Sequence, residues 1–431
     1  MPVPTTPRRD AYAAIRIPKF RRYIICLLAL TLGIQIQGTV VGWQVYDLTH
    51  DPLALGFIGL AEALPAIVTA LYAGHVVDTQ DRRRIALSAL IVLVGCSIAL
   101  WSLAHSTHGI VPGAHSSRLS AIYAIIVVSG IARAFLQPAR QALSAELVPR
   151  ELYPNAITWR SGSWQLAAVL GPAIGGGLYA LGGTSLAYAV DAALIITAVL
   201  VLWSIRHVSA PRAETNQRML TSLTSGLRFV RGEPIILGAM SLDLFSVLFG
   251  GATALLPVFA AEILHVGPAG LGILRAAPAA GAIITSITLT QFPPFERTGR
   301  TLLLAVAGFG LCTIGFGFSK NFAWSALFLW GSGACDMISV VVRSTLLQVR
   351  TPIDLMGRVS AVNQIFVGSS NEIGGFESGV TARWFGAANS VMFGGLATLG
   401  VVALVAWRLP MLRRMGRLIS ETPATSPRAN A

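Results

Sequence analysis

The chain is built from long apolar stretches separated by short polar gaps. A helix needs about 20 apolar residues to cross the hydrocarbon core of a bilayer. Twelve stretches reach this length, and they lie near residues 23–47, 53–78, 84–105, 119–146, 155–181, 185–205, 235–262, 268–291, 301–319, 322–349, 358–384 and 388–408. This pattern predicts an all-α membrane protein with about twelve transmembrane helices.

Composition agrees with a membrane protein and argues against a nucleic-acid partner. Charged residues make up 12% of the 431 residues, whereas soluble domains carry about 25%. The formal net charge is +13, but the arginines fall in alternate gaps between apolar runs, which is the pattern that fixes membrane topology. We therefore expect both termini in the cytoplasm and the protein in a bacterial inner (cytoplasmic) membrane.

The twelve spans divide into two sets of six around a polar linker. In that linker Leu220, Leu223, Leu227 and Val230 follow helical spacing, which predicts an amphipathic helix on the inner membrane surface. The expected parts are a basic cytoplasmic N-terminus (1–22), an N-terminal six-helix bundle (23–205), the cytoplasmic linker (206–234), a C-terminal six-helix bundle (235–410) and a disordered cytoplasmic tail (411–431).

The two halves match weakly in sequence. At constant shifts of 203 and 213 residues, glycines and prolines of the first half recur in the second. The pairs are Gly171 with Gly374, Gly176 with Gly379, Gly59 with Gly272, and Pro65 with Pro278. Chance is an alternative, because Gly and Pro are common in membrane helices. Transporters use such repeats to build a central path between pseudo-symmetric halves.

Few ionisable side chains lie inside the spans, and each is a functional candidate because a charge in a bilayer is costly. We assign six of them to a proton or substrate path: Glu62, Arg133, Asp243, Arg275, Asp336 and Glu372. The alternative is that they form static buried pairs that fix helix register. Asp191 and Glu377 lie toward the outer ends of their spans, where we expect them to reach interfacial water.

The loop after the second span carries a glycine, an acid four residues later and a basic cluster. It resembles the signature loop of the major facilitator superfamily, roughly G-x-x-x-D-x-x-G-R-R, and the matching residues are Gly74, Asp78, Arg82 and Arg83. The sequence departs at Asp81, where the family has glycine. The resemblance implies a cytoplasmic gate in which Asp78 docks on the start of the eleventh span, near Arg358. The alternative is a loop whose charges only set topology.

A second motif lies in the fifth span. Gly171, Pro172, Gly175 and Gly176 are similar to the G-P-x-x-G-G core of the superfamily's antiporters, although Ala167 replaces a further glycine. Residues 135–149 resemble the drug-efflux and siderophore-export branch, which includes enterobactin exporters and macrolide-efflux proteins. The resemblance implies export. Close helix packing alone would also explain the glycines.

Amides and aromatic residues in spans one, five and eleven are candidate substrate contacts. They are Gln35, Gln37, Trp43, Trp164, Asn363 and Asn371. The alternative is that the tryptophan on span one anchors the helix at the interface and the amides bond neighbouring helices.

Together these features predict a secondary active transporter that works as a monomer. The expected activity is proton-coupled export of a small amphipathic organic molecule, such as a siderophore, a macrolide or another drug-like compound, by alternating access. The sequence has no G-x-x-x-x-G-K-[ST] loop for ATP, and we expect no cofactor, no metal and no enzymatic activity. An importer, a lipid or lysolipid flippase on the same fold, and a membrane sensor that does not transport are the alternatives.

Overall fold

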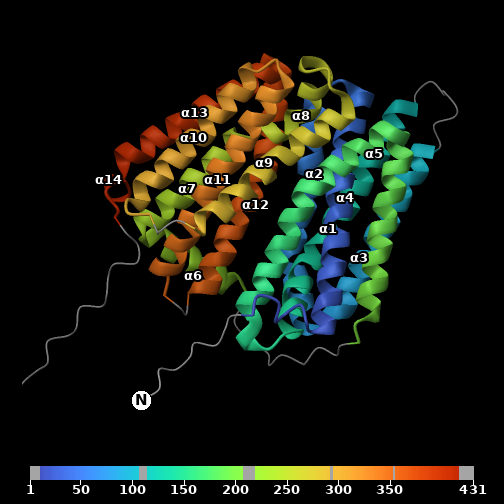
Figure 1. Ribbon diagram of the computed structural model, residues 1–431, viewed down its shortest axis with the longest axis horizontal. Coiled ribbons are helices and arrows are strands. Elements are labelled where there is room, and N and C mark those ends of the chain that lie inside the picture. Colours follow the sequence, from blue (N-terminus) through green and yellow to red (C-terminus); the bar gives the residue numbers. More distant parts are fainter. Residues whose placement is uncertain (1–9, 106–113, 207–218, 292–294, 353–354, 417–431) are drawn as a thin grey trace, which may run out of the picture. The chain divides into compact units, whose positions relative to one another are not determined.

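The structure, a computed structural model, describes residues 10–105, 114–206, 219–291, 295–352 and 355–416. Helices and turns account for these residues, and no strand occurs among them (Figure 1). The helices are α1 (Pro18–Thr49), α2 (Pro52–Thr79), α3 (Arg82–His105), α4 (Ala114–Glu146), α5 (Tyr153–Ser204), α6 (Met219–Gly232), α7 (Pro234–Phe249), α8 (Leu256–Val258), α9 (Gly267–Leu289), α10 (Thr298–Phe318), α11 (Phe322–Arg350), α12 (Met356–Phe385), α13 (Ala387–Arg408) and α14 (Pro410–Arg413).

The predicted membrane architecture is confirmed. Ten stretches of described helix are long and apolar enough to cross a membrane, and one of them, Arg150–Ser204, is 55 residues long. That stretch breaks at Gly182 and Gly183, where Gly183 has a φ of +66°, a backbone conformation that glycine adopts readily. Its two arms are the predicted spans 155–181 and 185–205. The more polar α12, with 30 residues, is long enough to be the remaining span.

Local sequence signals set the helix starts. Asp81 precedes α3, and its Oδ1 accepts hydrogen bonds from the backbone N–H groups of Arg83 at 2.8 Å and Arg84 at 3.2 Å. Asn321 caps α11 in the same way, through the backbone N–H of Ala323 at 2.9 Å. Such caps satisfy N–H groups that have no partner inside the helix. The residue that departs from the superfamily signature is therefore a helix cap.

The chain forms two compact units, which are described separately. Unit 1 comprises Met1–Thr49, Ala61–Glu214 and Gly267–Ala276. In it α1 packs along α5, and α3 packs against α4 and α5. The core between these helices is apolar, and its fully buried side chains include Phe20 and Leu143.

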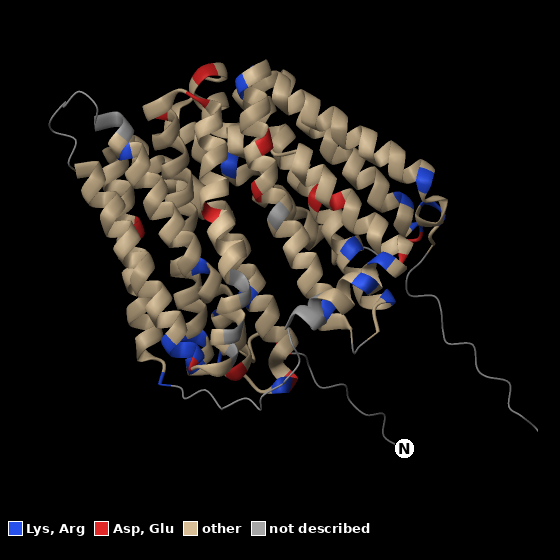
Figure 2. Ribbon diagram, turned by 180° about the vertical axis from the view of Figure 1, so that it is seen from behind, with Lys and Arg blue, Asp and Glu red and all other residues tan. Residues whose placement is uncertain are grey.

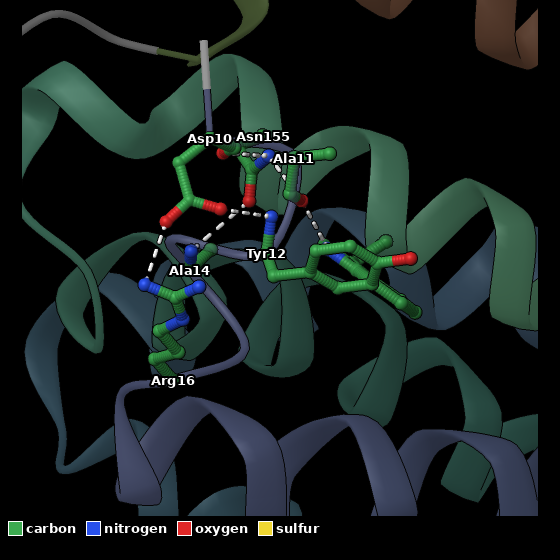
Figure 3. A network of polar contacts seen from close by, with 7 residues as sticks. Asp10, Ala11, Tyr12, Ala14, Arg16 and Asn155 are labelled. Carbon is green, nitrogen blue, oxygen red and sulfur yellow. Dashed lines mark hydrogen bonds and ion pairs between the residues drawn. The ribbon is translucent and has the colours of Figure 1, made fainter. Parts of the chain in front are cut away.

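The segment before α1 is fastened to the start of α5 (Figure 3). Asn155 accepts a hydrogen bond from the backbone N–H of Ala14 at 3.0 Å and donates one to the carbonyl of Ala11 at 2.7 Å. The Trp159 indole N–H also donates to the Ala11 carbonyl, at 3.1 Å. Asp10 pairs with Arg16 at 2.9 Å. The described part of the basic N-terminus therefore belongs to unit 1 and leads directly into α1.

Unit 2 comprises His50–Leu60, Thr215–Val266 and Ala277–Ala431. In it α10 packs against α11 and α13, while α12 packs against α6 and α7. Leu412 of α14 is fully buried in the core with Leu242 and Leu302. The expected disorder from residue 411 is therefore wrong for residues 411–416, because an apolar side chain holds this segment to the core. Residues 417–431 lie outside the described ranges.

The predicted linker helix exists as α6, but its described apolar side chains face protein. Leu227 and Val230 pack with Ile236 of α7 and Val359 of α12, and Val230 is fully buried. This part of the stripe therefore packs against α7 and α12, and the location of α6 at the membrane surface stays a prediction. The side chains of Leu220 and Leu223 lie outside the described part of the chain.

Charged residues are sparse along the described helices. Figure 2 shows long uncharged lengths of helix, with Lys and Arg gathered mainly toward helix ends and a few acids and bases at middle depth. Because an ionised group inside a bilayer is costly, the few charges at middle depth define the candidate site.

Candidate functional site

A polar group in unit 1 joins three helices. Arg133 of α4 forms an ion pair with Glu62 of α2, and its Nη2 donates a hydrogen bond to Gln37 Oε1 of α1 at 3.2 Å. The side chains of Arg133 and Glu62 are 22% and 35% exposed. Gly130, one turn before Arg133, lets α4 approach α2, because a side chain there would collide with the backbone carbonyl of Glu62. Three residues that the sequence singled out thus meet at one place.

A second arginine reaches the next residue of α1. Arg275, in the part of α9 that belongs to unit 1, donates from Nη1 to the carbonyl of Gly38 at 3.0 Å. Gly38 follows Gln37 directly, so both arginines converge on the same turn of α1. We call Gln37, Gly38, Glu62, Arg133 and Arg275 the unit 1 polar site. It offers two guanidinium groups, one carboxylate and one amide for ion pairing and hydrogen bonding.

Unit 2 contains a more deeply buried pair. Asp243 of α7 forms an ion pair with Arg343 of α11, and their side chains are only 8% and 7% exposed. Asp243 also lines a small cavity with Asp336 and Ser246, so the structure brings two of the predicted path residues together. Arg343 was not among the residues predicted for the path, because its position toward the end of its span fits a structural role equally well.

Glu372 of α12 lies against the first turns of α2 in unit 2. A methyl group on Gly59 would lie 2.8 Å from Glu372 Oε2. The small residue therefore leaves the space that this carboxylate occupies. The predicted path residues are thus divided between the two units, with Glu62, Arg133 and Arg275 in unit 1 and Asp243, Asp336 and Glu372 in unit 2.

The arginines of the signature loop make specific contacts. Arg82 is buried and forms an ion pair with Glu146 at the end of α4, and Arg83 Nη2 donates to the Trp203 carbonyl at 2.7 Å. In unit 2 Arg358 Nη1 donates to Ser225 Oγ at 3.2 Å. Gly74 lies half-buried in α2. The side chain of Asp78 lies outside the described residues, so the expected docking of Asp78 remains a prediction.

The glycine motif of α5 serves close helix packing inside unit 1. A methyl group on Gly171 would collide with Gln35, and one on Gly175 would lie 3.1 Å from Ile36 Cα. One on Gly176 would lie 2.9 Å from Gly272 Cα. The motif, with the adjoining Pro172, therefore lets α1 and the first turns of α9 approach the α5 backbone.

The remaining candidate substrate contacts have varied surroundings. Trp43 lies edge-on to Tyr179, with ring centroids 6.2 Å apart. Trp164 is 50% exposed, Asn363 is half-buried, and Asn371 is exposed and bonds its own helix at the carbonyl of Val367. Of the six candidates, Gln37 joins the unit 1 polar site directly, whereas Gln35 and Trp43 share its helix.

Asp191 is the ionisable residue that the sequence placed wrongly. It is fully buried. A methyl group on Gly33 of α1 would lie 2.9 Å from Asp191 Oδ1, and the side chains of Ser97 of α3 and Arg133 lie close enough to act on the carboxyl group. The expected exposure to interfacial water is wrong, because Asp191 faces α1 and α3. The position of a residue along a span does not indicate which neighbouring helix its side chain faces.

The side chains at these sites are ion-pairing and hydrogen-bonding groups. Within the described ranges no group of three or more His, Cys, Asp or Glu could hold a metal ion, and the four cysteines are free thiols. What the sites offer is ion pairing, hydrogen bonding and proton exchange on carboxylates.

Comparison with known proteins identifies the family. Residues 9–428 match the family described as transmembrane secretion effector. The enterobactin exporter EntS of Citrobacter koseri is 26% identical over 347 residues, covering 80% of this chain and 80% of the relative. The enterobactin exporter EntS of Escherichia coli O1:K1 / APEC shares the same identity and coverage.

Solved structures show the same fold. A D-xylose-proton symporter superposes with a TM-score of 0.70 at 13% identity, covering 93% of this chain and all of that one. The nucleoside transporter NupG superposes with a TM-score of 0.67 at 13% identity, covering 92% of this chain and 99% of that one. This protein is therefore a multi-pass membrane protein that belongs to the transmembrane secretion effector family of major facilitator superfamily transporters.

Proposed function

We propose that this protein exports a small amphipathic organic molecule, in exchange for protons, across the inner membrane of a bacterium. The observation that carries the proposal is the unit 1 polar site, in which Glu62, Arg133 and Gln37 meet on three spans. Relatives named as enterobactin exporters support a siderophore as the substrate class, and the sequence resemblance extends this class to macrolides and similar compounds. Both termini lie in the cytoplasm in this proposal, as the arginine distribution predicts.

Glu62 is the proposed point of exchange between proton and substrate. As a carboxylate it accepts hydrogen bonds from hydroxyl or ammonium groups of a substrate, and as the neutral acid it holds the proton instead. The same oxygen atoms serve both ligands, so proton and substrate exclude one another. Antiport requires this exclusion, because the transporter must carry either the proton or the substrate across the membrane, but not both together. Arg133 pairs with the Glu62 carboxylate and donates a hydrogen bond to Gln37, so the pair between α2 and α4 is also tied to α1.

The two helices that divide between the units are the proposed moving parts of alternating access. Residues 52–60 of α2 belong to unit 2 and the rest of α2 to unit 1, whereas residues 267–276 of α9 belong to unit 1 and the rest to unit 2. Each helix has an internal proline close to this division, Pro65 in α2 and Pro278 in α9. Proline removes a helix hydrogen bond and permits bending, so we propose hinges at these repeat-related positions.

An efflux panel tests the proposed function. Cells that express the protein are loaded with siderophores, macrolides or cationic dyes, and the rate of efflux is measured with and without a protonophore. We expect at least one compound to leave faster than from cells without the protein, and the protonophore to remove the difference. Accumulation in place of efflux would favour an importer, and no flux of any compound that the purified protein binds would favour a sensor.

Asp191→Asn tests a second proton site in unit 1. Asp191 is fully buried, and asparagine has almost the same size and shape as a neutral carboxylic acid. We therefore expect the free energy of unfolding to change by less than about 1 kcal/mol, within the range of one net hydrogen bond. Proton-driven export should fall strongly, since asparagine cannot release a proton.

Two measurements on this variant separate the possible roles of Asp191. Thermal unfolding reports stability, and export driven by an imposed pH gradient reports coupling. Thr197→Ala is the control, because Thr197 lies on the same arm of α5 but is exposed and bonds the carbonyl of Ala193 in its own helix. Export at the wild-type rate in Asp191→Asn would exclude Asp191 from proton coupling.

A further inference from the structure

A basic cavity lies at one end of unit 1, apart from the polar site. It has a volume of about 860 Å³ and opens where α1 and α3 begin and α5 ends. Four cationic side chains line it: Lys19, Arg22, Arg83 and Arg206. No Asp or Glu is among the described residues that line it. The cavity therefore has the charge of an anion-binding site.

Two of the arginines are held in place by the last turn of α5. Arg83 Nη2 donates to the Trp203 carbonyl at 2.7 Å, and Arg22 Nη1 donates to the Ser204 carbonyl at 3.2 Å. These bonds satisfy carbonyl groups that have no partner inside the helix. A guanidinium has five N–H groups, so each arginine can also bind an oxyanion. The Nε–H of Arg83 has no hydrogen-bond partner among the described residues.

The apolar part of the cavity faces outward from the helices. Leu200 and Trp203 line it and are 60% and 67% exposed. Tryptophan is enriched at the level of lipid headgroups, and a leucine one turn closer to the membrane centre suits an acyl chain. The ligand that matches both parts has a phosphate at one end and a hydrocarbon chain at the other.

We propose that this cavity binds the phosphate headgroup of an anionic phospholipid from the leaflet at the arginine-rich end of the protein. Basic pockets between membrane helices on the cytoplasmic side are suited to such headgroups. The lipid phosphate bridges the starts of α1 and α3 to the end of α5. Lipid binding at this cavity does not depend on transport. The proposal therefore goes beyond the proposed function, and an experiment can refute either one without refuting the other.

Binding of phosphatidylglycerol to the full-length protein in detergent tests the site, with phosphatidylcholine as the comparison lipid. The test variant is Lys19→Gln/Arg206→Gln, which leaves both arginines that bond α5 in place. Each cation near a lipid surface contributes about fivefold to binding, so removing two should weaken phosphatidylglycerol binding about 25-fold. The affinity for phosphatidylcholine should not change.

Arg84→Gln is the matched control, because Arg84 lies beside Arg83 on α3 but is 86% exposed and does not line the cavity. We expect it to bind phosphatidylglycerol as the wild type does. The proposal would be overturned if the double variant bound phosphatidylglycerol as tightly as the wild type, or if Arg84→Gln lost as much affinity as the double variant.

Inorganic phosphate at millimolar concentration distinguishes the two sources of the phosphate group. If it displaces the lipid, the cavity is a site for a free anion and the proposal is wrong, whereas binding that resists phosphate supports the lipid.

Arg22→Gln/Arg83→Gln provides a second test of the same site. This variant removes the two guanidiniums that bond the end of α5, so thermal unfolding must first show that it folds. In folded protein we expect a loss of phosphatidylglycerol binding at least as large as in the first variant. Binding at the wild-type level would overturn the proposal.

Discussion

Arg133→Gln should abolish proton-driven export while the protein still inserts and folds. The substitution leaves the Glu62 carboxylate without its ion-pair partner and Gln37 without its donor. Removing one member of a fully buried pair destabilises by about 3–5 kcal/mol. Since these side chains are 22% and 35% exposed, we expect a smaller loss, on the order of 2 kcal/mol. The measurements are export under an imposed pH gradient and thermal unfolding in detergent.

The double variant Glu62→Gln/Arg133→Gln separates a working site from a static pair. Two neutral amides can bond one another, so stability should return toward the wild-type value, yet export should stay absent because no carboxylate exchanges protons. Wild-type export in the double variant would mean that the pair only fixes helix register. Arg383→Gln is the control, because it breaks an exposed ion pair with Asp51 that should contribute no more than about 1 kcal/mol.

Asp243→Asn is expected to have the largest effect on stability. It leaves the Arg343 guanidinium, whose side chain is 7% exposed, without its counter-charge. Breaking a buried pair in this way destabilises by about 3–5 kcal/mol, a large fraction of the total stability of a typical protein. We expect low yields in the membrane and a clear drop in unfolding temperature relative to the wild type.

Asp243→Leu/Arg343→Met tests whether Asp243 also belongs to the transport path. Apolar residues of similar volume often replace a buried ion pair without loss of stability, so this variant should fold. If Asp243 and Asp336 share a proton path through the small cavity that they line, export should remain low in this folded variant. Export at the wild-type rate would mean that the Asp243–Arg343 pair has only a structural role.

The positions of the spans along the chain could be predicted from the sequence. The length and hydropathy of each run locate the spans, and Gly182 and Gly183 interrupt the helix between two predicted spans. The repeat likewise singled out Gly59 and Gly272, which both lie at close helix contacts. These features follow from local chemistry, since apolar length, glycine and proline act within one or two helical turns.

The direction in which a side chain points around its helix could not be predicted. Asp191 was expected at the interface but faces α1 and α3, and the partners of Arg82 and Asp243 were not identified in advance. In spans that are apolar on every side, hydrophobic periodicity carries little information about which face meets another helix. Orientation then depends on packing between distant segments, and a single sequence does not encode that packing in any short pattern.

Proton release during substrate uptake into inverted proteoliposomes tests the central claim most directly. With purified protein and a siderophore or macrolide that the efflux panel identifies, substrate entering the vesicle should drive protons out, and Glu62→Gln should remove both fluxes. Substrate uptake with no accompanying proton movement, or normal exchange in Glu62→Gln, would contradict the account.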